Sequence, residues 1–214
     1  MDLIGRIASP VGRKMLMGLT GLGFCGFLVV HLAGNFSLFQ GEAAFAAYTH
    51  KLHSLGALLK LAEFFLLLMA ALHIITAVVL TLENRAARPV PYEVSARHGG
   101  RTLASSSMIW TGLLTLGFLA LHLIGFKFVP PSGESRFPVV VETFSNALYV
   151  GAYLAGILAV AFHVSHGFWS AFQSLGVGND KGTPFLMRCA TWLAVVVGAG
   201  FASIPILFFL KVAG

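Results

Sequence analysis

Five of the eight histidines in this chain lie inside long apolar stretches, where an ionisable side chain is costly and usually functional. They are His31, His73, His122, His163 and His166. Imidazole is the usual axial ligand of haem iron, and two imidazoles on one iron leave no open position, which suits electron transfer rather than oxygen binding. Because a lone histidine in a membrane can also hydrogen-bond across a helix interface, the arrangement of the five must decide between these interpretations.

The stretches that carry these histidines predict transmembrane helices. Of the 214 residues, 57% are hydrophobic and 10% are charged, a composition outside the usual range of soluble domains. Each stretch is near the roughly 20 residues that cross the hydrocarbon core as a helix, and Glu63 is the single charged residue within them. They cover residues 15–37, 61–82, 103–126, 147–172 and 189–210. We therefore predict an all-α integral membrane bundle of five helices, forming one domain over residues 1–214.

The basic residues predict the orientation of this bundle. Nine Lys and Arg residues precede the first helix or lie between the second and third or the fourth and fifth helices, whereas five lie on the other side. By the positive-inside rule, the N-terminus is cytoplasmic and the C-terminus faces outward across the cytoplasmic membrane. Because topology accounts for the net charge of +6, no nucleic-acid partner is needed. The two cysteines stand alone, which excludes covalent haem c and iron–sulfur ligation by this chain.

The depths of the histidines predict two pairs. At about 1.5 Å per residue, His31 and His122 lie roughly 24–27 Å from the cytoplasmic ends of their helices. His73 and His163 lie roughly 15–17 Å from the same side. Two haems b, each held by one pair and stacked within the first four helices, would then span the membrane.

The fourth helix carries two histidines one turn apart. His166 is about 12 Å from the inner end of the helix and so lies further than His163 from the level of His73. Depth therefore favours His163 as the ligand, although spacing alone does not exclude His166. His166 is the alternative ligand, a contact of a haem propionate or a residue that faces a partner subunit.

The remaining segments carry no predicted haem ligand. The fifth helix lacks histidine and contains Pro205, so we assign it to packing or to a subunit interface. His98 lies among basic residues between the second and third helices and is expected to be a solvated loop residue. The segment 130–138 is expected merely to join the third and fourth helices, and no internal repeat is evident.

The histidine motifs resemble those of the diheme cytochrome b subunit of succinate:quinone oxidoreductases and quinol:fumarate reductases, of the single-chain type with five helices. The resemblance covers almost the whole chain and rests on one histidine in each of four successive helices, with none in the fifth. The strings that carry it are FLVVHL at 27–32, ALH at 71–73, LHL at 121–123 and FHVSHGFWS at 162–170, followed by Gln173 and Gly176.

The resemblance implies a place in a larger complex. In that family the first and third helices hold a distal haem near the outer face, here through His31 and His122. The second and fourth hold a proximal haem near the cytoplasm, here through His73 and His163. The implied partners are a flavoprotein subunit that binds FAD and the dicarboxylate, and an iron–sulfur subunit on the cytoplasmic side. This chain would pass electrons between the iron–sulfur subunit and a membrane quinone, for which menaquinone is the expectation, in succinate oxidation or fumarate reduction.

A polar cluster at the outer end of the second helix is the candidate quinone site. The resemblance implies a quinone near the distal haem, and we assign His53, Lys60 and Glu63 to it. Glu63 lies about 15 Å outward from His73, in an otherwise apolar stretch where a carboxylate can accept a proton. The alternative is an ion pair between Glu63 and Lys60, three residues apart on one helix face.

Two other functions fit the same histidines. The chain could be the cytochrome b anchor of another quinone-linked dehydrogenase or of a hydrogenase, with a different partner. It could also be a haem-free transporter or anchor whose histidines relay protons. A reduced-minus-oxidised spectrum separates these classes, because a proton-relay protein would show no haem bands.

Overall fold

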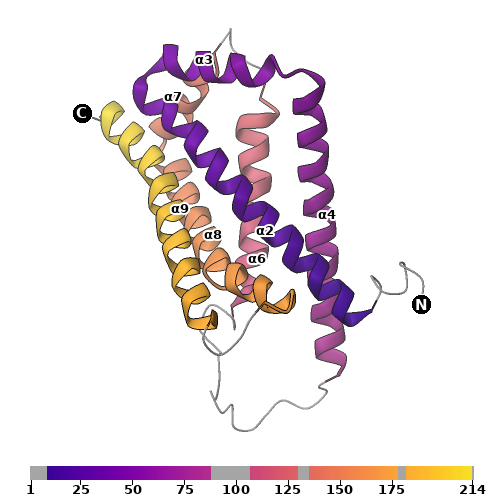
Figure 1. Ribbon diagram of the computed structural model, residues 1–214. Helices are drawn as coiled ribbons and strands as arrows, with labels where there is room; N and C mark the ends of the chain where they lie inside the picture. The colour runs from indigo at the N-terminus through magenta and orange to yellow at the C-terminus, as the bar shows by residue number, and fades with distance from the viewer. Residues whose placement is uncertain (1–8, 88–106, 130–134, 178–181, 214) are drawn as a thin grey trace.

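The computed structural model describes residues 9–87, 107–129, 135–177 and 182–213. Five of its helices are long and apolar enough to cross a membrane, which confirms the predicted number of spans. They are α2 (Pro10–Asn35), α4 (Ala57–Ala86), α6 (Met108–His122), α8 (Ala147–Ser174) and α9 (Gly182–Ala213). A π-helical turn, η2 (Leu123–Lys127), continues α6 and completes its span. All the described elements are helical, so the predicted all-α membrane class is confirmed (Figure 1).

The first helix begins earlier than the apolar pattern predicts because its first turn is capped. Ser9 Oγ accepts a hydrogen bond from the backbone N–H of Gly12 at 3.0 Å, and Pro10 occupies the first helical position. A serine cap and a proline at this position are both typical of helix starts. The added turn carries Arg13, whose guanidinium lies 2.6 Å from the carboxylate of Glu83 on α4.

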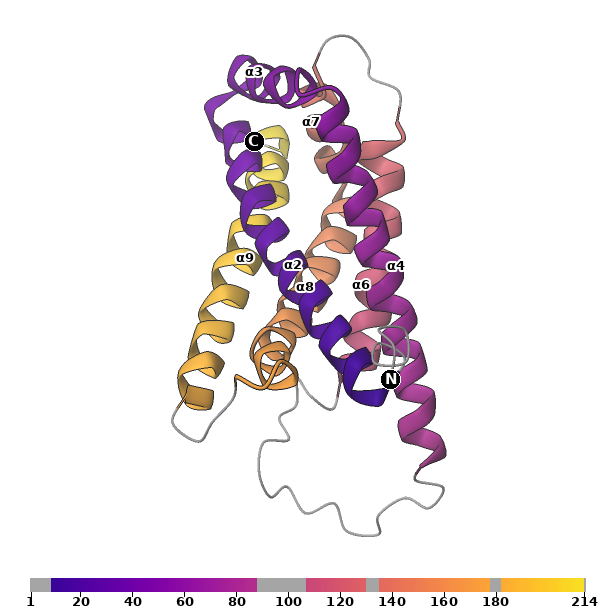
Figure 2. The same cartoon turned by 45° about the vertical axis from the view of Figure 1, so that its right-hand side comes forward.

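Three shorter helical segments were not predicted. They are η1 (Phe36–Gln40), α3 (Glu42–His53) and α7 (Phe137–Ser145). The expectation that the segment 130–138 merely joins two helices is wrong at its end, where α7 begins; residues 130–134 lie outside the described residues. α3 lies across one end of the bundle beside α7 (Figures 1 and 2). The ring of Phe45 on α3 lies 6.5 Å from that of Phe137 on α7, so apolar packing holds the two together.

Small residues allow the long helices to approach closely. A Cβ at Gly156 of α8 would overlap the ring of Phe118 on α6, and a Cβ at Gly18 of α2 would lie 3.2 Å from the carbonyl oxygen of Ala171 on α8. Glycine at such crossings is typical of membrane helices, whose association depends on close packing. α9 packs along α8 and buries Pro205 completely.

Ion pairs tie α4 to its neighbours at both ends. Glu83 near one end of the helix pairs with Arg13 of α2, and Glu63 near the other end pairs with Lys127 of η2. Between these ends α4 packs against α2, on the opposite side of the bundle from α9 (Figures 1 and 2). The helix is thus placed at the edge of the bundle with both of its ends fixed.

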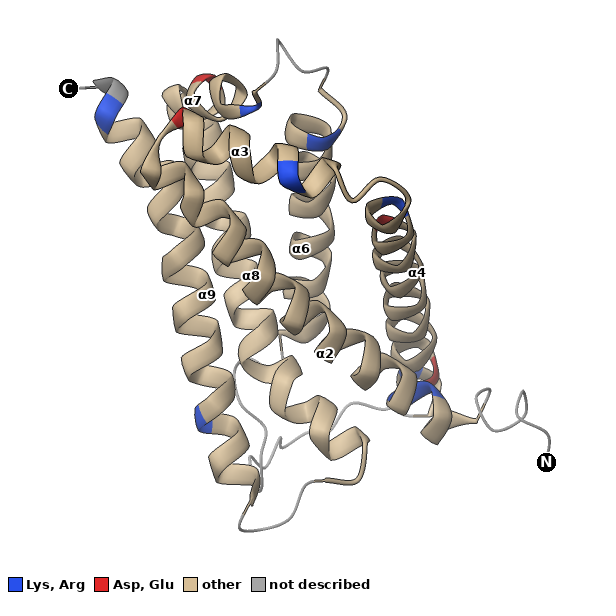
Figure 3. Cartoon of the chain, turned by 45° about the horizontal axis from the view of Figure 1, so that its top comes forward, with Lys and Arg blue, Asp and Glu red and all other residues tan. Residues whose placement is uncertain are grey.

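The charged residues gather toward the two ends of the bundle, and the middle of each long helix is free of them (Figure 3). α2 begins and α9 ends at opposite ends, as five crossings require (Figure 1). His98 and five of the basic residues used to predict the orientation lie outside the described residues. They are Arg6, Arg88, Arg97, His98, Arg101 and Lys181.

Candidate functional site

The structure brings four of the predicted histidines into two facing pairs. His73 of α4 and His163 of α8 have ring centres 6.3 Å apart, with the ring planes at 71°. His31 of α2 and His122 of α6 have ring centres 5.8 Å apart, with the planes at 87°. We call these the inner pair and the outer pair. Each pair joins two helices that are not consecutive in the chain.

Each ring of the inner pair rests against a threonine on a neighbouring helix. Thr20 Oγ1 of α2 lies 3.0 Å from Nδ1 of His73, and Thr111 Oγ1 of α6 lies 3.3 Å from Nδ1 of His163. A Cβ on the glycine that follows each threonine would lie 3.4 Å from Cε1 of the same ring. Each inner ring is therefore contacted by a threonine hydroxyl and packs closely against the glycine that follows this threonine.

Aromatic rings surround the outer pair. Phe27 stacks on His31 with ring centres 5.1 Å apart and planes at 16°. Phe201 of α9 lies 5.6 Å from His31, and Tyr153 of α8 lies 6.2 Å from His122. The fifth helix, which has no histidine, thus contributes a ring to the surroundings of the outer pair.

Thr20 and Thr111 occupy the same position in the two copies of an internal sequence repeat that was not predicted. The pattern M-x2-T-G-L-x3-G-F-L-x2-H-L-x-G occurs at residues 17–34 and again at 108–125. The expectation that the chain contains no internal repeat is therefore wrong. In both copies the histidine follows the threonine by 11 residues, which is about 16 Å along a helix. Each of α2 and α6 thus supplies one outer ring and, three turns away, one contact to an inner ring.

Each pair supplies two imidazole ligands, which suits a metal whose remaining ligands come from a cofactor rather than from the protein. A bond between imidazole nitrogen and a first-row metal is about 2 Å, so two rings on opposite sides of one metal have centres roughly 6 Å apart. The observed separations are 5.8 and 6.3 Å. In the part of the chain that the structure describes, no group of three or more His, Cys, Asp and Glu side chains is placed to hold a metal ion. Haem b, which brings its own equatorial nitrogens, fits such a pair of imidazoles.

Three buried polar atoms of α6 and α8 have no hydrogen-bond partner within the described ranges. They are Thr115 Oγ1, the hydroxyl of Tyr153 and Nδ1 of His166. Buried polar atoms in native proteins are nearly always hydrogen-bonded. These three therefore fit a bundle that binds a group with polar atoms at its edge, such as the propionates of a haem.

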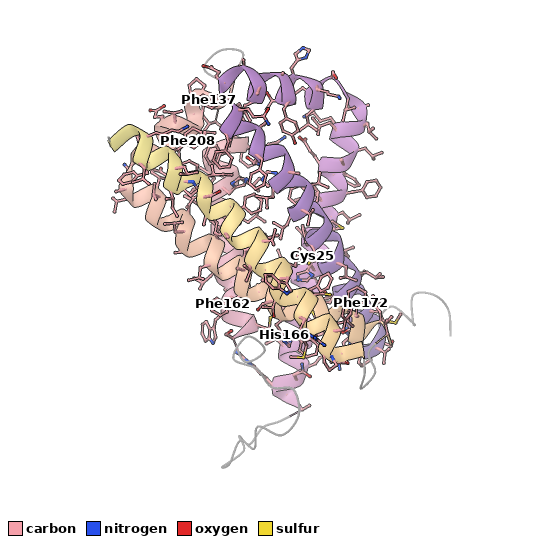
Figure 4. The ribbon with its side chains drawn as sticks, turned by 60° about the vertical axis from the view of Figure 1, so that its left-hand side comes forward. Cys25, Phe137, Phe162, His166, Phe172 and Phe208 are labelled. Carbon is pink, nitrogen blue, oxygen red and sulfur yellow. The ribbon has the colours of Figure 1, made fainter. Side chains whose placement is uncertain are left out.

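His166 does not share the place of His163. Its ring stands edge-on to Trp169, with ring centres 4.9 Å apart, and the histidine whose ring faces His73 is His163. Figure 4 shows His166 toward the same end of the bundle as Phe172. Its position one turn beyond His163 toward the end of α8 leaves it outside the inner pair.

The predicted quinone residues lie near the N-terminal end of α4 and at the C-terminal end of α3. Glu63 contacts Lys127 of η2, and its carboxylate lies 3.4 Å from Nζ of Lys60, so the alternative ion pair is present. The carboxylate side chain is 32% exposed. His53 is exposed at the end of α3, outside this network. The structure therefore adds Lys127 to the cluster and leaves His53 apart from it.

The chain is similar to one curated protein over most of its length. It is 26% identical over 185 residues to the succinate dehydrogenase cytochrome b558 subunit of Bacillus subtilis (strain 168), and the match covers 85% of each chain. No protein-family model matches, and neither does any solved structure. With its five apolar helices, the chain is a multi-pass membrane protein and a distant homologue of the cytochrome b558 subunit of succinate dehydrogenase, which confirms the resemblance stated from its histidine motifs.

Proposed function

We propose that this chain is the cytochrome b anchor of a succinate dehydrogenase or fumarate reductase, holding two haems b between a membrane quinone and the partner subunits. The observation that carries the proposal is the double histidine pair, with one ring from each of four helices. The name of the homologue states both a cytochrome b and a succinate dehydrogenase, which supports the same cofactor and complex for this chain.

The four histidines would hold the two haems at two levels. His73 and His163 are the proposed axial ligands of the proximal haem, and His31 and His122 those of the distal haem. Haem b supplies reversible one-electron oxidation and reduction at its iron. The two imidazoles of each pair would hold the iron from both sides and so exclude oxygen as a ligand. The three-turn offset along α2 and α6 separates the two sites by about 16 Å along each helix, roughly half the thickness of the hydrocarbon core.

For the quinone, with menaquinone as the expectation, we propose a site at the outer end of the bundle formed by Glu63, Lys60 and His53. Reduction or oxidation of a quinone moves one proton with each electron, so the site needs a group that exchanges protons with water. The partly exposed carboxylate of Glu63, held between Lys60 and Lys127, can reach both the bundle and the solvent. The proposed flavoprotein and iron–sulfur partners dock at the opposite end, where α2 begins and α8 ends.

The test of the proposal is the haem content of single histidine variants. The purified chain should contain two haems b with different midpoint potentials, because aromatic rings surround one pair and hydroxyl groups contact the other. His31→Ala or His122→Ala should remove one haem and leave the other, and His73→Ala should do the reverse. A pyridine haemochrome assay that finds a single haem in the parent chain would overturn the proposal.

The two histidines of α8 make a separate test. His163→Ala should lose the proximal haem, because its ring faces His73, whereas His166→Ala should keep both haems. Haem content and the reduced-minus-oxidised spectrum measure the outcome. The assignment would fail if His163→Ala kept both haems and His166→Ala lost one.

A further inference from the structure

Three threonines of the described chain are buried as whole residues: Thr20, Thr76 and Thr111. The hydroxyl groups of Thr20 and Thr111 lie against the rings of the inner pair. Thr76 Oγ1 donates to carbonyl oxygens of its own helix, at 2.7 Å to Leu72 and at 3.1 Å to His73. Two of the three threonines thus contact a histidine ring, and the third, Thr76, is a comparison of similar burial that contacts none.

The hydrogen of each ring-contacting hydroxyl is already engaged. Thr20 Oγ1 donates to the carbonyl oxygen of Leu16 at 2.8 Å and lies 3.1 Å from that of Met17. Thr111 Oγ1 bonds in the same way to the carbonyl oxygens three and four residues before it. A hydroxyl has one hydrogen, so toward the ring it accepts, and Nδ1 of each histidine is the donor. The backbone carbonyl of Met17 also accepts from His73, and that of Met108 from His163, so each threonine oxygen is one of two acceptors beside its ring. Nε2 is then the ring nitrogen that keeps a free lone pair.

We propose that Thr20 and Thr111 are positioning residues that fix Nε2 of His73 and of His163 as the iron ligands and lower the midpoint potential of the proximal haem. This inference rests on the proposed function. A ring that donates its Nδ1 hydrogen to an oxygen becomes a more basic ligand through its other nitrogen. A more basic ligand stabilises the oxidised iron, so the potential falls.

Among the described residues, no hydroxyl is hydrogen-bonded to a ring of the outer pair. The side-chain nitrogen Nδ2 of Asn35 lies 3.4 Å from Nδ1 of His31, and it donates a hydrogen bond to the backbone carbonyl of the same histidine at 2.8 Å. An amide N–H can donate but cannot accept, so it does not take up the hydrogen of the ring. The side chains beside the ring of His122 are the aromatic rings of Phe118, Phe126 and Tyr153. The effect therefore falls on the proximal haem and not on the distal haem.

The experiment removes each hydroxyl oxygen in a chain that keeps only the proximal haem. In the His31→Ala background, redox titration should show one haem. Thr20→Val and Thr111→Val should each raise its midpoint potential, and Thr20→Ser, which keeps the oxygen, should restore the parent value. Thr76→Val is the matched control and should leave the potential unchanged. The ferric low-spin EPR signal, which reports on the donor strength of the axial ligands, should change in the two ring-contacting variants and not in the control.

Two results would overturn the inference. One is an unchanged potential and EPR signal in Thr20→Val and Thr111→Val with the haem retained. The other is a shift in Thr76→Val as large as theirs, which would mean a general response to loss of a buried hydroxyl. The threonines lie on different helices, so a variant of one that fails to insert leaves the other as the test. A parent chain without haem would instead overturn the proposed function, so the two failures are distinct.

Discussion

Glu63 lies between two lysines of different elements, with Lys60 on its own helix and Lys127 on η2. The two contacts have different origins. The pair with Lys60 follows from a spacing of three residues on one helix face. The pair with Lys127 requires α6 and its extension to end beside the N-terminal end of α4. A carboxylate placed in this way keeps its contact with the solvent while its neighbours hold it beside the bundle.

We expect Glu63→Gln to abolish most quinol turnover while both haems are retained, because the amide cannot exchange a proton. Loss of a group that transfers protons typically lowers the rate by roughly 10²–10⁴-fold. The rate of haem reduction by quinol, measured together with haem content, gives the result. Glu83→Gln is the matched control, since Glu83 is an ion-paired glutamate at the other end of the same helix. Unchanged turnover in both Glu63→Gln and His53→Ala would move the quinone site elsewhere.

The candidate ligands could be predicted from the sequence, but their contacts could not. A histidine in an apolar stretch is conspicuous because its charge is costly there. A threonine such as Thr20 is not, since it can satisfy its hydroxyl within its own helix. Its role becomes visible through contact with His73, 53 residues away. The shared spacing of Thr20 to His31 and of Thr111 to His122 was nevertheless present in the sequence and was the pattern to look for.

The length of each helix decided whether it could be predicted from the apolar pattern of the sequence. The five spans stand out because about 20 apolar residues match the thickness of the bilayer. α3 and α7 have 12 and 9 residues and do not reach that length. Their positions depend on tertiary contacts such as the one between Phe137 and Phe208 on α9, whose ring centres are 5.7 Å apart. The helix crossings could not be predicted either, because a glycine in a membrane helix indicates close packing but does not identify the helix that packs against it.

We expect Gly156→Ala to destabilise the protein by about 1–3 kcal/mol, the usual cost of overpacking a filled interior. The added methyl group would overlap Phe118, whose ring also lies 6.2 Å from that of His122. The temperature at which haem absorbance is lost measures the effect. Gly151→Ala is the control on the same helix, because a Cβ there meets no described atom within 4 Å. Equal melting temperatures for the two variants would contradict the predicted overlap.

In the whole molecule, the two histidine pairs divide the bundle into two levels built by the same helices. α2 and α6 each take part at both levels, and so does α8, which brings His163 to the inner pair and Tyr153 beside the outer pair, whereas α4 brings one inner ring. α3 and α7 lie at the end of the bundle where α9 ends (Figures 1 and 2). The two ends of the bundle therefore differ in structure, and the orientation predicted from the basic residues assigns α3 and α7 to the outer side.

We expect this orientation to be visible by labelling with a membrane-impermeant maleimide. In a Cys25→Ser, Cys189→Ser background, Ser54→Cys at the end of α3 should react in intact spheroplasts. Val177→Cys after α8 should react only after permeabilisation, although Val177 is 58% exposed. The same labelling of detergent-solubilised protein is the control for accessibility. The opposite pattern in spheroplasts would reverse the orientation.

The distribution of the two histidine pairs over four helices also determines the order in which the two sites are completed during synthesis. Each pair takes one ring from the first two spans and one from the third or fourth, and chains emerge from the ribosome N-terminus first. The first two spans therefore enter the membrane with half of each site and with neither site complete. The outer pair is complete once His122 has been inserted, and the inner pair must wait for His163. We expect a nascent chain arrested between these two residues to bind at most the distal haem.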